Sequence, residues 1–178
     1  MSALATAAER DAILTGDVLT HLDAQLVGVR RLLQIVLEQG AAIRQRDVHN
    51  VVRLAGILQA EMQRRAQLED QRMLLLERAG ARLGVTASSV TLSLLEGVMD
   101  PGAVPDARTR SSELRGLLSE VQREHACNRA LMHQELAFLD HLLRLVEDGS
   151  GAYNAGGERP TGTHSLLANR RGVFDQEV

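Results

Sequence analysis

The sequence contains no tryptophan and no lysine, and its only aromatic residues are Phe138, Tyr153 and Phe174. Base-stacking surfaces for single-stranded nucleic acids are built from aromatic side chains, which are nearly absent here. The formal net charge of −3 also disfavours binding to a phosphate backbone. The lack of lysine excludes Schiff-base chemistry and the lysine of a phosphate-binding loop. We therefore expect no nucleic-acid partner.

Cysteine and long apolar runs are equally scarce. Cys127 is the single cysteine, so no internal disulfide can form, as is usual in a reducing compartment. We expect its thiol to be buried and inert. Glu9, Arg10 and Asp11 interrupt the region where a signal peptide would be apolar, and no run approaches the roughly 18 apolar residues of a membrane span. These features predict a cytoplasmic protein without stable membrane insertion.

Apolar residues recur at helical spacing through most of the 178-residue chain. The expected helices run from about Thr6 to Arg46, Asp47 to Gly84, Ser88 to Met99 and Pro105 to Glu147. Gly16 leaves open a start of the first helix nearer Asp17. Short connections make neighbouring helices antiparallel. The pattern predicts an all-α fold, an elongated antiparallel bundle of three long helices plus one short helix.

The last thirty residues have a different composition, rich in glycine and interrupted by Pro160. This composition predicts a flexible C-terminal tail over residues 149–178, after a bundle domain over residues 1–148. A small apolar and basic cluster lies near the end of the tail. It consists of Leu166, Leu167, Arg170, Arg171, Val173 and Phe174.

The longest expected helix carries more apolar residues than one buried face requires. One stripe consists of Leu114, Leu118, Val121, Met132, Leu136, Leu139, Leu143 and Val146. A second stripe, about 110° away, consists of Leu131, Phe138, Leu142 and Leu145. Either another helix of the same chain covers the second stripe, or it forms a groove for an amphipathic helix of another protein.

Polar residues offer few candidates for chemistry. His125 and Asn128 fall on the first stripe, where we expect them to be structural core residues, with a ligand or proton-carrying role for His125 as the alternative. Cys127 and His125 are two residues apart and point to different helix faces. No Glu-x-x-His pair occurs, so no metal site and no cofactor are expected. The charged run from Glu61 to Arg78 is predicted to be a solvated face.

Several segments together carry a family resemblance. The last helix contains NRALMHQELAFLDHLLRL (Asn128 to Leu145), and YNAGG (Tyr153 to Gly157) follows in the tail. RQRDVHNVVRLAGILQAEMQRR and LGVTASSVTL precede them. In this combination the chain resembles FlgN-type flagellar export chaperones over nearly its whole length. That family often has two asparagines three residues apart; Asn128 matches the second, and His125 stands in place of the first.

The resemblance implies a cytosolic chaperone that holds the helical ends of hook–filament junction (hook-associated) proteins and delivers them to the flagellar export gate. By this carry-over, Leu131, Phe138, Leu142 and Leu145 would hold the client, and Tyr153 would face the gate; alternatively, its ring caps the bundle. Leu166 and Leu167 would be a further docking motif, or would shield the groove in the absence of client.

Two other classes of function remain open at the level of sequence. A histidine phosphotransfer domain is also a helical bundle, but neither His21 nor His133 is followed by the Lys and Gly usual there. A self-associating structural coiled coil would use the surplus stripe to pair with itself. The chaperone interpretation is compatible with a monomer or a weak dimer.

Overall fold

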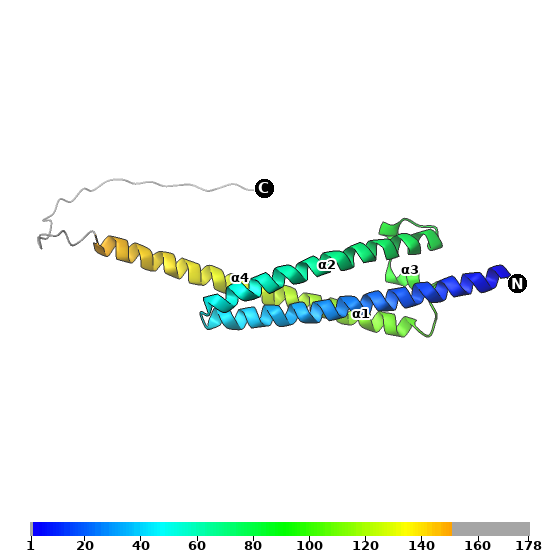
Figure 1. Ribbon diagram of the computed structural model, residues 1–178, viewed down its shortest axis with the longest axis horizontal. Coiled ribbons are helices and arrows are strands. Elements are labelled where there is room, and N and C mark those ends of the chain that lie inside the picture. Colours follow the sequence, from blue (N-terminus) through cyan, green and yellow to red (C-terminus); the bar gives the residue numbers. More distant parts are fainter. Residues whose placement is uncertain (1, 151–178) are drawn as a thin grey trace, which may run out of the picture. The chain divides into compact units, whose positions relative to one another are not determined.

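The computed structural model describes residues 2–150, with side chains from residue 9 to residue 146. It comprises α1 (Ser2–Arg44), α2 (Val48–Leu83), the 3₁₀ turn η1 (Ala87–Ser89), α3 (Leu92–Glu96) and α4 (Val104–Ser150), arranged as Figure 1 shows. No strand occurs between residues 2 and 150. The prediction of an all-α bundle with three long helices and one short helix is therefore confirmed. The predicted tail lies outside the described residues from residue 151 onward.

α1 begins earlier than the sequence indicated and passes through Gly16 without a break, so a start near Asp17 is wrong. Gly16 is exposed, and no neighbouring atom would contact a Cβ there. A mid-helix glycine costs only about 1 kcal/mol relative to alanine. Burial of Leu14 and Val18 on either side is worth more than that cost.

A tight turn joins α1 to α2. Arg46 has a positive φ of 55°, and the backbone N–H of Asp47 donates back to the carbonyl of Ala42 at 3.0 Å. This is the Schellman type of helix end. Asp47 then caps α2, because its Oδ1 accepts from the backbone N–H of Asn50 at 3.0 Å. Such a short connection makes α1 and α2 an antiparallel hairpin.

The segment expected as one helix from Ser88 to Met99 is instead divided. After η1 the chain is extended at Val90 and Thr91, and α3 has only five residues. The Thr91 hydroxyl accepts from the backbone N–H of Leu94 at 3.3 Å, and Gly97 ends the helix. A threonine that caps its own helix must leave helical geometry, which explains the break.

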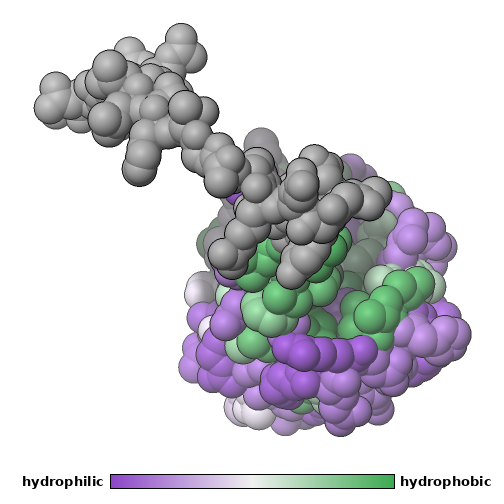
Figure 2. Space-filling view, turned by 90° about the vertical axis from the view of Figure 1, so that its left-hand side faces the viewer, coloured by the Kyte–Doolittle hydropathy of each residue, from purple (hydrophilic) through white to green (hydrophobic). Residues whose placement is uncertain are grey.

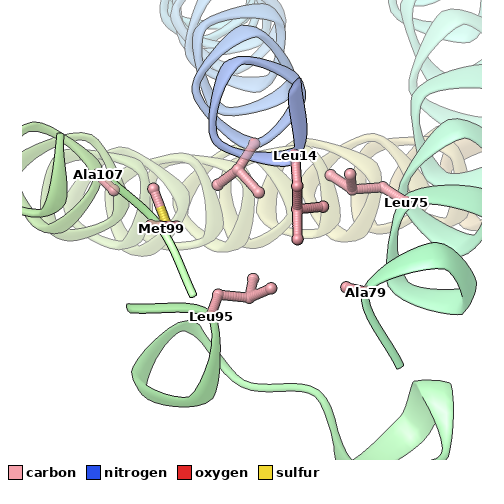
Figure 3. Close-up of a cluster of buried hydrophobic side chains, with 7 residues drawn as sticks. Leu14, Leu75, Ala79, Leu95, Met99 and Ala107 are labelled. Carbon is pink, nitrogen blue, oxygen red and sulfur yellow. The ribbon is translucent and has the colours of Figure 1, made fainter. Parts of the chain in front are cut away.

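The core lies where the three long helices and α3 meet (Figure 3). This cluster consists of Leu14, Val18, Leu75, Ala79, Leu95, Met99 and Ala107. A second cluster joins Val29, Leu32 and Val36 of α1 to Val121 of α4, with Leu58 of α2 packed against it. A third joins Ile35 and Ala42 to Leu54 of α2. The helices thus run up, down and up, with α4 parallel to α1.

Two compact units divide the chain, Met1–Glu135 and Leu136–Val178. The boundary falls inside α4, which is one continuous helix across it. The three buried clusters lie in the first unit. The described part of the second unit is the last fifteen residues of α4.

Candidate functional site

In the first unit, the buried face of α4 follows a seven-residue repeat. Ala107, Val121 and Asn128 are buried at positions of this repeat, and Leu114, between Ala107 and Val121, is half-buried. We call this line of residues the seam. A seven-residue repeat is the spacing at which one helix follows its neighbours along a bundle. The seam therefore tracks α1 and α2 from the start of α4 to Asn128.

Asn128 is the polar member of this seam and is 3% exposed. Its Nδ2 donates to the backbone carbonyl of Val36 in α1 at 2.7 Å. Buried amides require such partners, and the bond joins α4 to α1 at one register. His125, which we expected beside it in the core, is exposed. That expectation is corrected because the seam passes through residues 121, 124 and 128 rather than 125.

The same repeat changes the interpretation of the two apolar stripes where the first unit ends. Leu131 is half-buried, whereas Met132 is 41% exposed. The sequence interpretation assigned Met132 to the core stripe and Leu131 to the surplus stripe. The structure reverses this assignment. Met132 follows Val121 by eleven residues, and because this step does not fit the seven-residue repeat, the Met132 side chain is rotated away from the buried face. Leu131 thus lies at the edge of the bundle core.

Further along α4, in the second unit, the apolar side chains are exposed. Phe138 is 48% exposed, Leu142 40% and Leu145 54%. Four others, Leu136, Leu139, Leu143 and Val146, are more than half exposed. Seven large apolar residues within eleven positions of one helix are an unusual amount of exposed apolar surface. In the face that Figure 2 displays, hydrophobic residues gather near the middle of the visible surface, and hydrophilic residues border them.

The remaining face of this segment is polar. Asp140 and Arg144 form an ion pair at 2.8 Å, and both side chains are mostly exposed. His141 is exposed as well. An exposed ion pair of this kind contributes well under 1 kcal/mol, so it solubilises the segment rather than organising a site. The segment is therefore amphipathic, with its apolar half open.

Cys127 is exposed, which corrects the expectation of a buried thiol. Its neighbour Asn128 lies on the seam, and consecutive side chains on a helix point in directions about 100° apart. Cys127 consequently faces away from the bundle.

The charged run on α2 also contains a residue that sequence reasoning missed. Glu61 is 6% exposed, and its Oε2 lies 2.8 Å from Arg64 Nη1 and 3.2 Å from Arg31 Nε. The expectation of a fully solvated face is therefore wrong at Glu61. The spacing could have predicted the burial of Glu61, because this residue follows Leu54 by seven residues and precedes Leu68 by seven.

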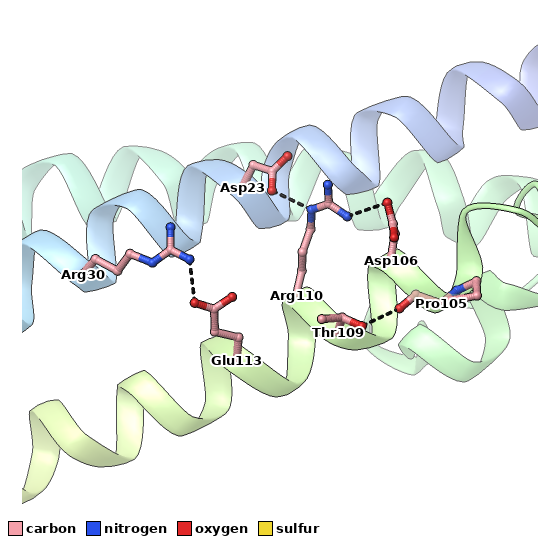
Figure 4. Close-up of polar contacts among 7 residues, drawn as sticks. All are labelled: Asp23, Arg30, Pro105, Asp106, Thr109, Arg110 and Glu113. Carbon is pink, nitrogen blue, oxygen red and sulfur yellow. Dashed lines mark hydrogen bonds and ion pairs between the residues drawn. The ribbon is translucent and has the colours of Figure 1, made fainter.

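Ion pairs also join the helices of the first unit (Figure 4). Arg110 Nε donates to Asp23 Oδ1 at 2.6 Å, and Arg30 of α1 pairs with Glu113 of α4. Arg108 binds Glu96 of α3 through two nitrogens, and this bonding lowers the pKa of the Glu96 carboxyl. These pairs are at the surface, so they orient the helices more than they stabilise them.

Within the described residues, no group of three or more histidine, cysteine, aspartate or glutamate side chains is arranged to hold a metal ion. None of the helices in the described part combines the length and hydropathy needed to cross a bilayer. Three predicted site residues, Tyr153, Leu166 and Leu167, lie outside the described residues.

The described residues form an all-helical bundle, and its longest helix carries exposed apolar side chains between Leu136 and Val146. A family model described as FlgN protein matches residues 6–161. The chain therefore belongs to the FlgN family, a family of chaperones of flagellar export. Comparison with curated proteins found no match, and comparison with solved structures found none either.

Proposed function

We propose that this chaperone binds the helical terminal regions of hook–filament junction proteins in the cytoplasm and delivers them to the export gate. The observation that carries the proposal is the exposed apolar half of α4 at Phe138, Leu142 and Leu145, in a member of the FlgN family. Leu131, half-buried in the first unit, is proposed as a further client contact.

The mechanism follows from apolar burial. Client helices that assemble only after export have unpaired apolar stripes, which aggregate before assembly. The chaperone supplies a complementary stripe, and each buried leucine or phenylalanine contributes roughly 1.5–3 kcal/mol. Part of that gain is offset by the cost of ordering both partners, so the complex remains reversible and the gate can remove the client. These steps involve no bond-breaking and no cofactor.

The residues beyond the described part have separate proposed roles. Tyr153 contacts the export gate, and Leu166 with Leu167 adds a second contact with the client. A free chaperone that is a monomer or a weak dimer leaves the apolar half of α4 available.

The test is a binding titration with recombinant terminal fragments of junction proteins from the same organism. Phe138→Asp combined with Leu142→Asp abolishes binding, because two charges are placed in the buried interface. His133→Asp combined with His141→Asp is the matched control, with the same charges at exposed polar positions of the same helix. Circular dichroism verifies that both variants stay helical.

The competing functions predict different results. If the Phe138/Leu142 variant unfolds, these side chains belong to the core of the protein and the proposal fails. A long-lived homo-oligomer that buries this face, seen by light scattering, would indicate a self-associating coiled coil. Stable phosphorylation of a histidine by a response regulator would indicate a phosphotransfer domain.

A further inference from the structure

Two adjoining depressions are lined only by residues of the first unit and have no role in the proposed function. The first, the apolar cavity, has a volume of about 180 Å³ and lies between α1, α2 and α3. The second, the basic hollow, is wider, about 610 Å³, and lies between α3 and α4. Leu92 of α3 and Ser111 of α4 line both, so the two depressions meet at these side chains.

The apolar cavity is suited to one aliphatic or aromatic side chain. Most of its wall is apolar and comes from Val18, Leu22, Leu75, Leu76, Val90 and Leu95. Leu75 and Leu95 form the inner part of this wall, since they are buried in the cluster that Figure 3 shows. Arg72, which also lines the cavity, is already paired with Glu69 at 2.6 Å. Pockets for small molecules have volumes of roughly 300–1,000 Å³, so this cavity fits a single leucine or phenylalanine side chain better than a lipid or a cofactor.

The basic hollow has an excess of positive charge. Two arginines, Arg108 and Arg115, line it with one carboxylate, Glu96, which Arg108 already binds through two nitrogens. Arg115 is exposed and forms no ion pair with another described residue. Its Nε donates one long hydrogen bond, 3.4 Å, to the carbonyl of Ser111. A carboxylate from a partner suits this group, because guanidinium binds carboxylates through charge-assisted hydrogen bonds.

The spacing of the two depressions specifies how far apart the apolar group and the carboxylate lie in the ligand. Ser111, at the edge of the cavity, and Arg115 are four residues apart on α4, which corresponds to about 6 Å. In an extended peptide, side chains two residues apart point the same way and are separated by about 6.6 Å. A helix also places residues four apart at this distance, but a bound helix needs an apolar stripe along several turns, and the cavity accepts one side chain.

We propose that the two depressions form a binding site for an extended acidic segment of a partner protein. Its pattern is leucine or phenylalanine, then any residue, then aspartate or glutamate. The apolar side chain enters the cavity, and the carboxylate two positions later pairs with Arg115. None of the lining residues is proposed to hold a client, so this second partner binds whether or not a client is present.

The probe is the peptide acetyl-Ala-Leu-Ala-Glu-Ala-amide, titrated against the full chain with isotope-labelled leucine and valine methyl groups. NMR should show saturable shifts at the methyl groups of Val18, Val90 and Leu95, which line the cavity. Three control peptides each change one feature: glutamine replaces glutamate, glycine replaces leucine, or glutamate moves to the position next to leucine. Each control should bind at least fivefold more weakly than the probe.

Arg115→Gln tests the contact with the carboxylate. This variant should bind the probe as weakly as the glutamine peptide and should leave the glutamine peptide unchanged, because both changes remove the same interaction. Arg129→Gln, at another exposed position of α4, is the matched control and should bind the probe within twofold of the unaltered protein. Circular dichroism verifies that both variants are folded.

Several results would overturn the inference. If the cavity methyl groups show no saturable shifts, no apolar side chain enters. If the four peptides bind equally, or if Arg115→Gln weakens the probe and the glutamine peptide alike, no carboxylate is recognised. Octanoate that binds at the same methyl groups more tightly than the probe would indicate a fatty-acid site. The variant with Phe138→Asp and Leu142→Asp should bind the probe normally while it loses the client, so this inference and the proposed function fail separately.

Discussion

Gly40 of α1 and Asn128 of α4 fit together so closely that a Cβ on residue 40 would stand 2.5 Å from Oδ1 of Asn128. The absent side chain at residue 40 leaves the space in which the buried amide reaches the carbonyl of Val36. One glycine and one asparagine, 88 positions apart in the chain, therefore set the register between two helices.

Gly40→Ala is expected to destabilise the protein by about 1–2 kcal/mol. Alanine would displace the Asn128 amide from its buried hydrogen bond, and a lost buried partner costs more than the gain in helix propensity. Gly16→Ala is the matched control, because Gly16 is exposed with open space around it and should gain about 0.5–1 kcal/mol. Urea denaturation measures both changes. In an Asn128→Ala background, Gly40→Ala should become neutral or stabilising; an unchanged loss there would contradict the proposed coupling.

Glu61→Leu is expected to leave the free energy of unfolding unchanged or to raise it by about 1 kcal/mol. Leucine continues the seam of Leu54 and Leu68, and replacing a buried ion pair by an apolar residue of similar volume is often neutral or stabilising. The side chains of Arg31 and Arg64 are half-exposed, so in the variant water can solvate both guanidinium groups. Denaturant titration at neutral pH measures the effect. A loss above about 2 kcal/mol would show that the carboxylate is required for the packing of α1 on α2.

His21 predicts a dependence of stability on pH. Desolvation lowers the pKa of its half-buried ring below the usual 6.5, and the charge of nearby Arg72 acts in the same direction. The unfolded chain therefore binds a proton more readily than the folded chain. Stability from this group is complete above pH 6.5 and is lost as pH falls through the folded pKa. His21→Gln should flatten the curve of unfolding free energy below pH 6.5. An unchanged slope in this variant would assign the effect to another group.

Deletion of residues 149–178 is expected to leave the bundle folded, with a melting temperature within a few degrees of the full chain. All three buried clusters lie between Leu14 and Val121, far from the deleted segment in the sequence. Differential scanning calorimetry of the two proteins measures the change. A drop of more than about 10 °C, or several kcal/mol for a domain of this size, would show that the deleted residues pack on the bundle.

Much of the fold could be predicted from local chemistry. The turn residues around Asp47 and the break at Pro101–Gly102 separate helical segments, and apolar spacing identifies the long helices. Helix ends were less predictable. Thr91 caps the N-terminus of α3, so the residues before it are extended and not helical. This arrangement is stable because Leu95 still reaches the core from the short helix and Val90 packs against the same cluster. Spacing alone does not contain that information.

Composition and 3.6-residue spacing are local properties, and they are enough to predict that the chain is helical and that its last helix has an apolar surplus. The resemblance to the FlgN family came from particular segments of the sequence. Which side chains the bundle covers depends on how the helices pack against one another. The tertiary structure placed Glu61 and Asn128 inside, left His125 and Cys127 outside, and exchanged Leu131 with Met132. The physical reason is that helices in a bundle follow a seven-residue seam set by their neighbours, and the small drift between that seam and an ideal helix decides which side chains are buried.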